Sequence, residues 1–351
     1  MTNLPEDPIH GQENRPQNDP AEFPSADPPS TAGQLAAPEN RTLTPPSFDG
    51  VPASVASSPT SPQSPIGEPP LFRYAPQLPA PPTVRIPHLG HLALLVPLLG
   101  VGFVAAVLLS IAAVHFHAFG VASTQQAATN IHYILGTEAV IYLVSFAAAL
   151  LIFPVFWQEN LFAGLQWNGA AIRRLFGRLF GAALACFSLA IFSGPFMSSP
   201  TNAPIEKVFR TPGAAWLLFA FGVTLAPFFE EMFFRGFLLP ALCTAYDWMV
   251  EKLTGAPPLL LGPNGHPRWS LAAMIVGSIA TSLPFALMHG EQTSFALGPL
   301  TLLVGVSLVL CAVRLITRSL AASTLVHACY NFMLFTVMAI GTGGFRHFDK
   351  M

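Results

Sequence analysis

Long apolar runs separated by short polar segments begin at about residue 89, whereas residues 1–85 contain no long apolar run. A helix needs about 20 mostly apolar residues to cross a hydrocarbon core about 30 Å thick. Seven runs meet that requirement, and they predict transmembrane helices at 91–114, 133–156, 175–197, 214–239, 269–289, 297–316 and 320–341. An eighth membrane element would fit in 238–253 or 257–261, because the stretch between the fourth and fifth runs is long and partly apolar.

This pattern predicts an all-α, polytopic helical membrane protein of seven or eight transmembrane helices around an internal polar cavity. The membrane domain covers 86–341, and 342–351 form a polar C-terminal tail too short to cross a bilayer. Residues 1–85 are rich in Pro, Ser and Ala and carry more acidic residues than arginines. Such a segment cannot bury enough surface to offset its chain entropy, so we expect an acidic, disordered spacer.

Composition narrows the class of protein further. Of the 351 residues, 52% are hydrophobic and only 10% are charged, against about 25% charged in soluble domains. The net charge of −2 provides no basic surface for nucleic acid, so a polymer-binding role is excluded. The cysteines lie in or beside apolar segments without C-x-x-C spacing, and we expect them to be packing residues: Cys186, Cys243, Cys311 and Cys329.

Flanking charges predict the orientation in the membrane. Basic residues precede the first and third predicted helices: Arg73, Arg85, Arg173, Arg174 and Arg178. Residues 115–131 carry none, so the positive-inside rule places the N-terminal tail in the cytoplasm. Arg314 and Arg318, which we expect between the sixth and seventh helices, agree with that topology. The first twenty residues lack the features of a signal peptide, so targeting would rely on the membrane segments. We expect an integral membrane protein.

Three charged residues interrupt the fourth apolar run, within Thr224–Leu239. Residues four apart share a helix face, so Glu231 and Arg235 can pair while Glu230 faces elsewhere. An ionisable side chain at mid-bilayer costs about 2.5–3.5 kcal/mol, so an unpaired carboxylate indicates a functional site. The simpler interpretation of this motif alone is an ion-paired contact between packed helices.

Two later helices each carry residues at the same spacing of four: Phe285 with His289, and His327 with Asn331. Imidazoles and amides are costly in apolar helices unless they face a cavity lined by protein. Together with Glu230 they form a set able to activate a water molecule. In this scheme Glu230 and His289 hold and deprotonate the water, while His327 and Asn331 donate hydrogen bonds to the developing oxyanion. Each histidine alone is more simply an interhelical hydrogen bond, and only their joint occurrence favours catalysis.

The remaining polar residues in or beside the spans are assigned no chemistry. Glu138 lies early in the second predicted helix, where a lone carboxylate reaches headgroups or water. His115, His117 and His132 flank a loop without further ligands at matching spacing, so we expect interfacial residues and no metal site.

Three motifs resemble the signatures of the CPBP family, the intramembrane proteases of the type II CAAX prenyl endopeptidase and bacteriocin-processing (Abi) group. They are Glu230-Glu231-x-x-x-Arg235, Phe285-x-x-x-His289 and His327-x-x-x-Asn331. Ala226-Pro227 and Arg235-Gly236 also resemble the usual surroundings of the first motif. Each motif is short, but their order in separate apolar helices is specific, and the resemblance covers about 212–335. The 1–85 tail and the absence of a clear span after the third motif depart from the family pattern.

The resemblance implies an endopeptidase that cleaves a membrane-embedded protein, a lipidated protein or a leader peptide, with Glu230 and His289 on the water and His327 and Asn331 on the oxyanion. Glu231, Arg235 and Phe285 would support them. Members have been described as metalloproteases, but without an H-E-x-x-H pair this set favours a mechanism with no metal cofactor. A non-catalytic role in bacteriocin immunity or scaffolding stays open. A transporter ranks lower because the motifs are not repeated, and no feature indicates an oligomeric state.

Overall fold

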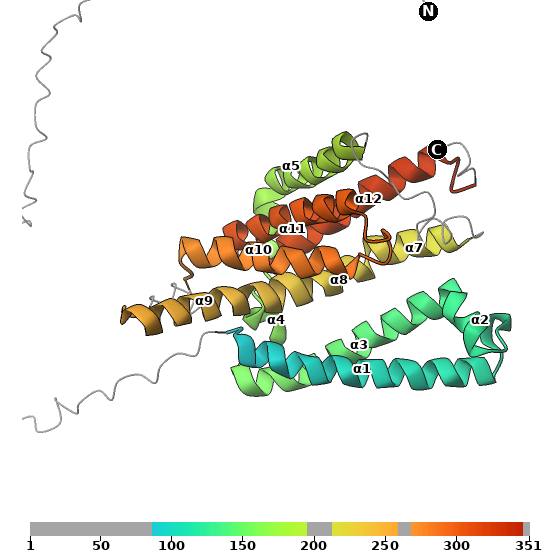
Figure 1. The fold of residues 1–351 in the computed structure, drawn as a ribbon, viewed down its shortest axis with the longest axis horizontal. Coiled ribbons are helices and arrows are strands. Elements are labelled where there is room, and N and C mark those ends of the chain that lie inside the picture. Colours follow the sequence, from blue (N-terminus) through green and yellow to red (C-terminus); the bar gives the residue numbers. More distant parts are fainter. Residues whose placement is uncertain (1–85, 195–212, 259–267, 347–351) are drawn as a thin grey trace, which may run out of the picture. The chain divides into compact units, whose positions relative to one another are not determined.

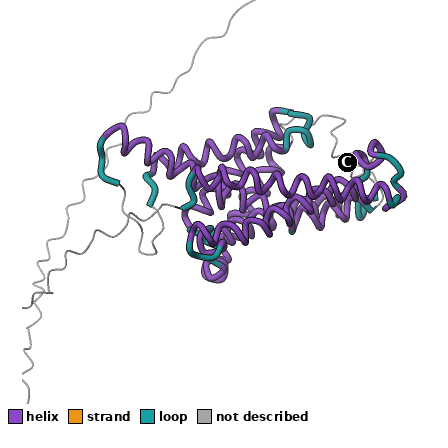
Figure 2. The backbone as a smooth tube through the Cα atoms, turned by 90° about the horizontal axis from the view of Figure 1, so that it is seen from below, coloured by secondary structure: helices purple, strands orange, loops and turns teal. Residues whose placement is uncertain are grey.

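A computed structural model describes residues 86–194, 213–258 and 268–346 (Figure 1). The chain divides into two units, 1–75 and 76–351, and the whole tail predicted to be disordered lies outside the described residues. The described chain consists of helices joined by short loops, without a strand (Figure 2). In order the elements are α1 (Leu89–His115), η1 (Ala118–Gly120), α2 (Thr124–Thr129), α3 (Ile131–Trp157), α4 (Leu161–Gly164), α5 (Gly169–Ser193), α7 (Ala214–Val223), α8 (Leu225–Glu231), η3 (Met232–Leu238), α9 (Leu239–Thr254), α10 (Leu271–Met288), α11 (Leu297–Thr317) and α12 (Leu320–Gly341).

Seven helical segments of the described chain are long and apolar enough to cross a membrane, which confirms the polytopic all-α prediction. Most boundaries lie within a few residues of those expected. The third span is an exception, because α5 begins at Gly169 whereas the apolar run predicted a start at 175. The Asn168 side chain explains this earlier start, since it accepts hydrogen bonds from the Ala170 and Ala171 amides at 3.1 and 3.4 Å.

The fourth span is much longer than predicted. From α7 to α9 it covers 41 residues, Ala214–Thr254, and α7, α8 and α9 lie in one line in Figure 1. At 1.5 Å per residue this corresponds to about 60 Å, twice the hydrocarbon thickness. The first stretch suggested for an eighth element, 238–253, is therefore the continuation of the fourth span as α9. In the second, residues 257 and 258 are irregular and the others lie outside the described residues.

Helices α1 and α3 pack side by side as a hairpin (Figure 1). Gly102 allows their close approach: a Cβ atom there would lie 2.3 Å from the Ser145 hydroxyl oxygen and 2.7 Å from the Ile141 carbonyl oxygen. The Ser145 hydroxyl also donates to the Leu98 carbonyl at 3.2 Å. Small residues at such contacts are typical of helix packing in membranes, where close van der Waals contact replaces the hydrophobic effect.

Helices α5, α9, α10, α11 and α12 pack on one another as a second group beside the hairpin of α1 and α3. Helix α12 packs on α5 and α11, and α10 packs on α9 and α11. Buried apolar residues of α5, α11 and α12 form a common core that includes Leu179, Leu310 and Val326. Cys186, Cys243 and Cys311 are buried, Cys329 is partly buried, and all four are free, as expected for packing residues.

A buried carboxylate joins α9 to α10. Asp247 in α9 accepts hydrogen bonds from the Ser270 amide at 3.0 Å and from the Ser270 hydroxyl at 2.6 Å. Ser270 is the N-cap of α10, and its hydroxyl oxygen accepts from the Ala273 amide at 3.1 Å. Asp247 thus fixes the start of the helix whose other end leads into His289.

Candidate active site

The helix that carries the two glutamates is interrupted just before them. Thr224 separates α7 from α8, with φ −116° and ψ −75°. Pro227 lacks the N–H that would bond to the Val223 carbonyl, and its ring disfavours a regular preceding turn. Across this break, the Gly222 carbonyl accepts a hydrogen bond from Asn331 Nδ2 in α12 at 2.8 Å. A side chain from a distant helix therefore completes the backbone hydrogen bonding at the break.

A second irregularity follows the glutamates. Residues Met232–Leu238 form a π-helix, and the Leu239 amide bonds to the carbonyl five residues back. In this register the Arg235 carbonyl would need the N–H of Pro240, which proline does not have. Instead it accepts a hydrogen bond from Arg314 Nε in α11 at 3.2 Å. The two prolines thus flank the segment of glutamates. Arg314 of α11 bonds to a carbonyl within this segment, and Asn331 of α12 bonds to the Gly222 carbonyl that precedes it.

Arg235 forms a fully buried ion pair with Glu231, as their spacing predicts. The Arg235 Nη1 and Glu231 Oε1 atoms are 2.9 Å apart, and neither side chain is exposed. Arg235 Nη2 donates to the Ser307 hydroxyl at 2.7 Å, and the guanidinium lies 4.4 Å from the centroid of the Phe285 ring. Phe285 therefore contributes a cation–π contact, which is stronger away from water.

Glu230 faces two imidazoles. Its Oε2 atom lies 3.9 Å from His289 Nε2 and 3.8 Å from His327 Nε2, and it has no hydrogen-bond partner. The other ring nitrogens are engaged: His289 Nδ1 is 2.9 Å from the Phe285 carbonyl oxygen, and His327 Nδ1 is 3.1 Å from Glu231 Oε1. Both partners are acceptors, so Nδ1 carries the proton in each ring. In their neutral forms both histidines therefore present an Nε2 lone pair to Glu230.

The structure brings together six of the seven residues singled out from the sequence: Glu230, Glu231, Arg235, Phe285, His289 and His327. Asn331 lies on the same helix as His327, but its amide group bonds to the Gly222 carbonyl. Within the described residues no hydrogen bond or ion pair joins Asn331 to the other six. It contacts the helix break that precedes the glutamates.

Arg314 corrects one expectation from the sequence. It does not lie in a loop between two spans but is fully buried within α11, where it also donates to Gln166 Oε1 at 2.9 Å and to the Leu165 carbonyl at 3.3 Å. Its charge therefore lies inside the protein and is no guide to membrane orientation. A signal was present in the sequence, because Ser307 and Arg314 are seven apart and share one face of an apolar helix.

Glu138 also differs from expectation. It is a partly buried acceptor for the Tyr142 hydroxyl at 2.7 Å, not a lone carboxylate at the headgroups. Glu138 lies close enough to Glu230 and His289 to interact electrostatically with both. The spacing of four between Glu138 and Tyr142 in an apolar helix was the available signal.

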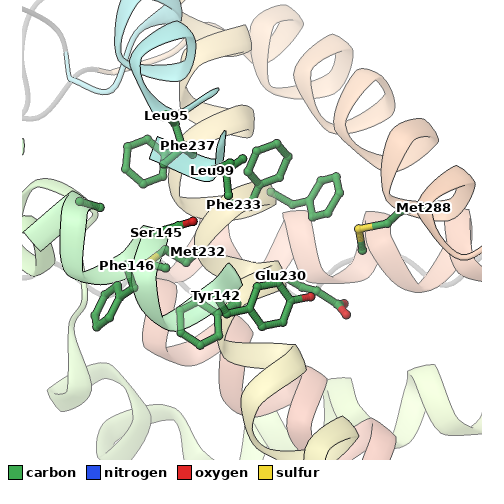
Figure 3. Close-up of a pocket in the computed structure, with 13 residues that line it drawn as sticks. Leu95, Leu99, Tyr142, Ser145, Phe146, Glu230, Met232, Phe233, Phe237 and Met288 are labelled. Atoms are coloured by element: carbon green, nitrogen blue, oxygen red, sulfur yellow. The ribbon is translucent and has the colours of Figure 1, made fainter. Parts of the chain in front are cut away.

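A cavity of about 220 Å³ adjoins Glu230 (Figure 3). Most of its lining is apolar and comes from α1, α3 and η3, with Leu95, Phe146, Phe233 and Phe237 as examples. The cavity predicted from the sequence to be polar therefore has apolar walls, and its carboxylate is Glu230.

The atoms around Glu230 Oε2 are of types that zinc binds, but their spacing is wide. At zinc–ligand distances of about 2.0–2.1 Å, tetrahedral ligand atoms lie about 3.3 Å apart, whereas Glu230 Oε2 is 3.8 and 3.9 Å from the two imidazole nitrogens. No group of three or more His, Cys, Asp or Glu side chains is arranged to hold a metal ion in the part of the chain that the structure describes. The expectation of a metal-independent site stays a prediction.

Comparisons with known proteins bear on this region. Residues 212–333 match the family model described as type II CAAX prenyl endopeptidase Rce1-like. No curated protein and no solved structure matches the chain. The matched segment runs from the start of α7 into α12 and includes all seven residues singled out above, with Asn331 near its end. The match over residues 212–333 supports the assignment of this segment to the CPBP family.

Proposed function

We propose that this protein is an intramembrane endopeptidase that hydrolyses a peptide bond with a water molecule activated by Glu230. The observation that carries the proposal is the convergence of one carboxylate oxygen and two imidazole nitrogens, at 3.8 and 3.9 Å, beside a cavity in a membrane protein. Glu230 Oε2 and His289 Nε2 are both hydrogen-bond acceptors when the imidazole of His289 is neutral. Water has two hydrogens to donate, so such a group favours binding it and removing its proton.

In the proposed reaction Glu230 takes one proton from the water. His289 Nε2 accepts a hydrogen bond from the other O–H group and so orients the molecule. The water oxygen forms a bond to the carbonyl carbon of the substrate. The carbon–nitrogen bond then breaks, and the proton held by Glu230 passes to the leaving amine. The Phe285 carbonyl supports this role, because its contact with Nδ1 keeps the His289 lone pair on Nε2.

His327 has a different partner and therefore a different role. Its Nδ1 faces the buried Glu231 carboxylate, whereas His289 Nδ1 faces a backbone carbonyl. With a proton on Nε2 as well, His327 would donate a hydrogen bond to the carbonyl oxygen as it becomes negative. Asn331 would assist with the amide hydrogen that is not bonded to the Gly222 carbonyl. Arg235 holds Glu231 in position for this purpose.

The substrate class follows from the position of the site. Glu230 is 10% exposed, within a helix of the membrane domain, and the adjoining cavity is mostly apolar. We therefore assign a substrate whose scissile bond lies at or in the membrane: a membrane protein, a lipidated protein or a leader peptide. The setting would be the inner membrane of a bacterium, with the N-terminal tail in the cytoplasm.

The test uses the full chain in liposomes and a library of membrane-associated peptides. Glu230→Gln and His289→Ala should each lower turnover by about 10²–10⁴-fold. Matched controls are Glu291→Gln and His115→Ala, which change the same residue types at exposed positions. Cleavage retained by Glu230→Gln would overturn the proposal. If a protective phenotype against a bacteriocin survived in that variant as well, a non-catalytic role would replace it.

A further inference from the structure

Polar groups are scarce on the walls of the cavity beside Glu230. Besides Glu230, only Tyr142 and Ser145 among its lining residues have polar N or O atoms in their side chains. The Ser145 hydroxyl donates to the Leu98 carbonyl of α1 at 3.2 Å. Tyr142 is therefore the second polar group that faces the cavity, and the proposed reaction gives it no role.

Contacts on two sides fix the position of Tyr142. Its hydroxyl donates to Glu138 Oε1 at 2.7 Å, one helical turn earlier in α3. Its ring stacks on Phe229, with the centroids 4.8 Å apart and the planes 25° from parallel. Phe229 directly precedes Glu230, and Figure 3 shows the Tyr142 hydroxyl pointing toward the Glu230 carboxylate. The tyrosine is thus tied to the segment that carries the proposed base.

The direction of the Tyr142 hydrogen bond determines what its oxygen offers. The one hydroxyl hydrogen goes to Glu138, so the phenolic oxygen presents a lone pair toward the cavity. Glu230 Oε2 is an acceptor too, and the lone pair of His289 Nε2 lies 3.9 Å from it. The polar end of the cavity is therefore rich in acceptors, and it matches a ligand that brings hydrogen-bond donors. In a peptide substrate those donors are the backbone N–H groups beside the scissile bond.

We infer that Tyr142 binds the substrate by accepting a hydrogen bond from a backbone N–H next to the bond that is cleaved. Glu138 is a positioning residue, because its carboxylate holds the hydroxyl hydrogen and keeps the lone pair on the cavity side. This inference rests on the proposed peptidase function. It specifies an extended peptide with an unsubstituted amide at one position near the scissile bond.

Single variants test the hydroxyl apart from the ring. Tyr142→Phe keeps the stacking on Phe229 and should lower kcat/KM about tenfold, mainly through KM, because the substrate amide loses its acceptor. Glu138→Leu should lower kcat/KM by a similar factor. Glu138→Gln keeps an acceptor oxygen for the Tyr142 hydroxyl, so its kcat/KM should stay near the wild-type value. The control is Tyr133→Phe in the same helix, whose hydroxyl donates to the Ala118 carbonyl at 3.2 Å, and it should leave kcat/KM unchanged.

A second measurement identifies the amide. Peptides of the cleaved sequence are made with one backbone amide at a time replaced by an ester, which removes the N–H with little change in shape. Binding is measured to the Glu230→Gln protein in liposomes, where no turnover is needed. One ester should weaken binding about tenfold when Tyr142 is present and leave it unchanged in the Tyr142→Phe background.

The outcomes separate the two proposals. If Tyr142→Phe cleaves like wild type while Glu230→Gln does not, the role of Tyr142 is overturned and the peptidase stands. If no ester position depends on Tyr142, the inferred hydrogen bond is likewise rejected. If Glu230→Gln cleaves like wild type, the proposed function fails, and the binding measurement still decides whether Tyr142 contacts a peptide.

Discussion

Arg314 Nε donates a hydrogen bond to the carbonyl oxygen of Arg235 at 3.2 Å, so one buried arginine completes the backbone of another. Arg314 belongs to α11. Arg235 contacts the same helix, because its Nη2 donates to the Ser307 hydroxyl. The segment with the glutamates is therefore attached to α11 through a side chain and through the main chain. In the π-helical register the Arg235 carbonyl would pair with residue 240, and Pro240 has no N–H to donate.

Arg314→Met should lower the free energy of unfolding, because it leaves several buried acceptors without a donor, at about 1–3 kcal/mol for each. Adding Pro240→Ala supplies an N–H one turn after Arg235 and should recover about 1 kcal/mol. Unfolding in detergent, followed by circular dichroism, measures both variants. Equal stability of the single and double variants would show that Pro240 is not the reason for the contact.

Replacement of glutamate by glutamine should lower the free energy of unfolding strongly at Glu231 and hardly at all at Glu230. Glu231→Gln leaves the Arg235 charge buried without a counterion and should cost about 3–5 kcal/mol of stability. Glu230→Gln removes a carboxylate whose Oε2 has no partner and should change stability by less than about 1 kcal/mol while abolishing turnover. Denaturation and activity are measured on the same preparations. A large loss of stability in Glu230→Gln would contradict the division between a working and a supporting carboxylate.

Asn331→Ala should lower stability as well as activity. It removes the donor to the partly buried Gly222 carbonyl at the break between α7 and α8, and the loss of such a hydrogen bond costs about 1 kcal/mol. A residue that contacted only the oxyanion would reduce kcat and leave the unfolding curve unchanged. Comparing the two readouts in one variant therefore distinguishes a backbone contact from a purely catalytic one.

Removal of metal ions should leave cleavage within about twofold of the untreated rate, because the proposed reaction uses side chains alone. The measurement compares turnover in liposomes before and after treatment with EDTA or phenanthroline, with the metal content determined separately. Loss of activity that added zinc restores would instead indicate that Glu230, His289 and His327 close around an ion.

The hairpin of α1 and α3 can be tested with two glycines of one helix. Gly102→Ala should destabilise the protein by about 1–3 kcal/mol, since the added Cβ meets the Ser145 hydroxyl and the Ile141 carbonyl of α3. Gly100→Ala is the control, because its Cβ meets no atom within 4 Å. Similar thermal unfolding of both variants would mean that the hairpin adjusts without cost.

The sequence predicted features that depend on one helix at a time. Apolar runs located the spans, and the spacing of four located the Glu231–Arg235 pair, because both patterns repeat with the helix itself. Contacts between helices were harder to predict. Arg314 meets Arg235 across 79 positions of the chain, and Asn331 meets Gly222 across 109. Nothing local indicates such partners, so the sequence revealed neither the contact of Arg314 with the Arg235 carbonyl nor that of Asn331 with the Gly222 carbonyl.

The π-helix was beyond prediction for a related reason. Pro240, which follows it, was visible, but a proline within an apolar run is compatible with a kink, a break or a helix end. Which of these forms depends on the donors that neighbouring helices offer to the unpaired carbonyls. Here that donor is Arg314, and its position is set by the packing of α11.

The bond between Asp247 and Ser270 has a consequence for how such a site tolerates changes in chain length. Glu230 lies 17 residues before Asp247, and His289 lies 19 residues after Ser270, on two helices joined by that bond. A residue inserted between either pair would advance the helix by about 1.5 Å and turn one of the two functional groups by about 100°. Insertions and deletions in these two helical arms should therefore be more damaging than most substitutions along them.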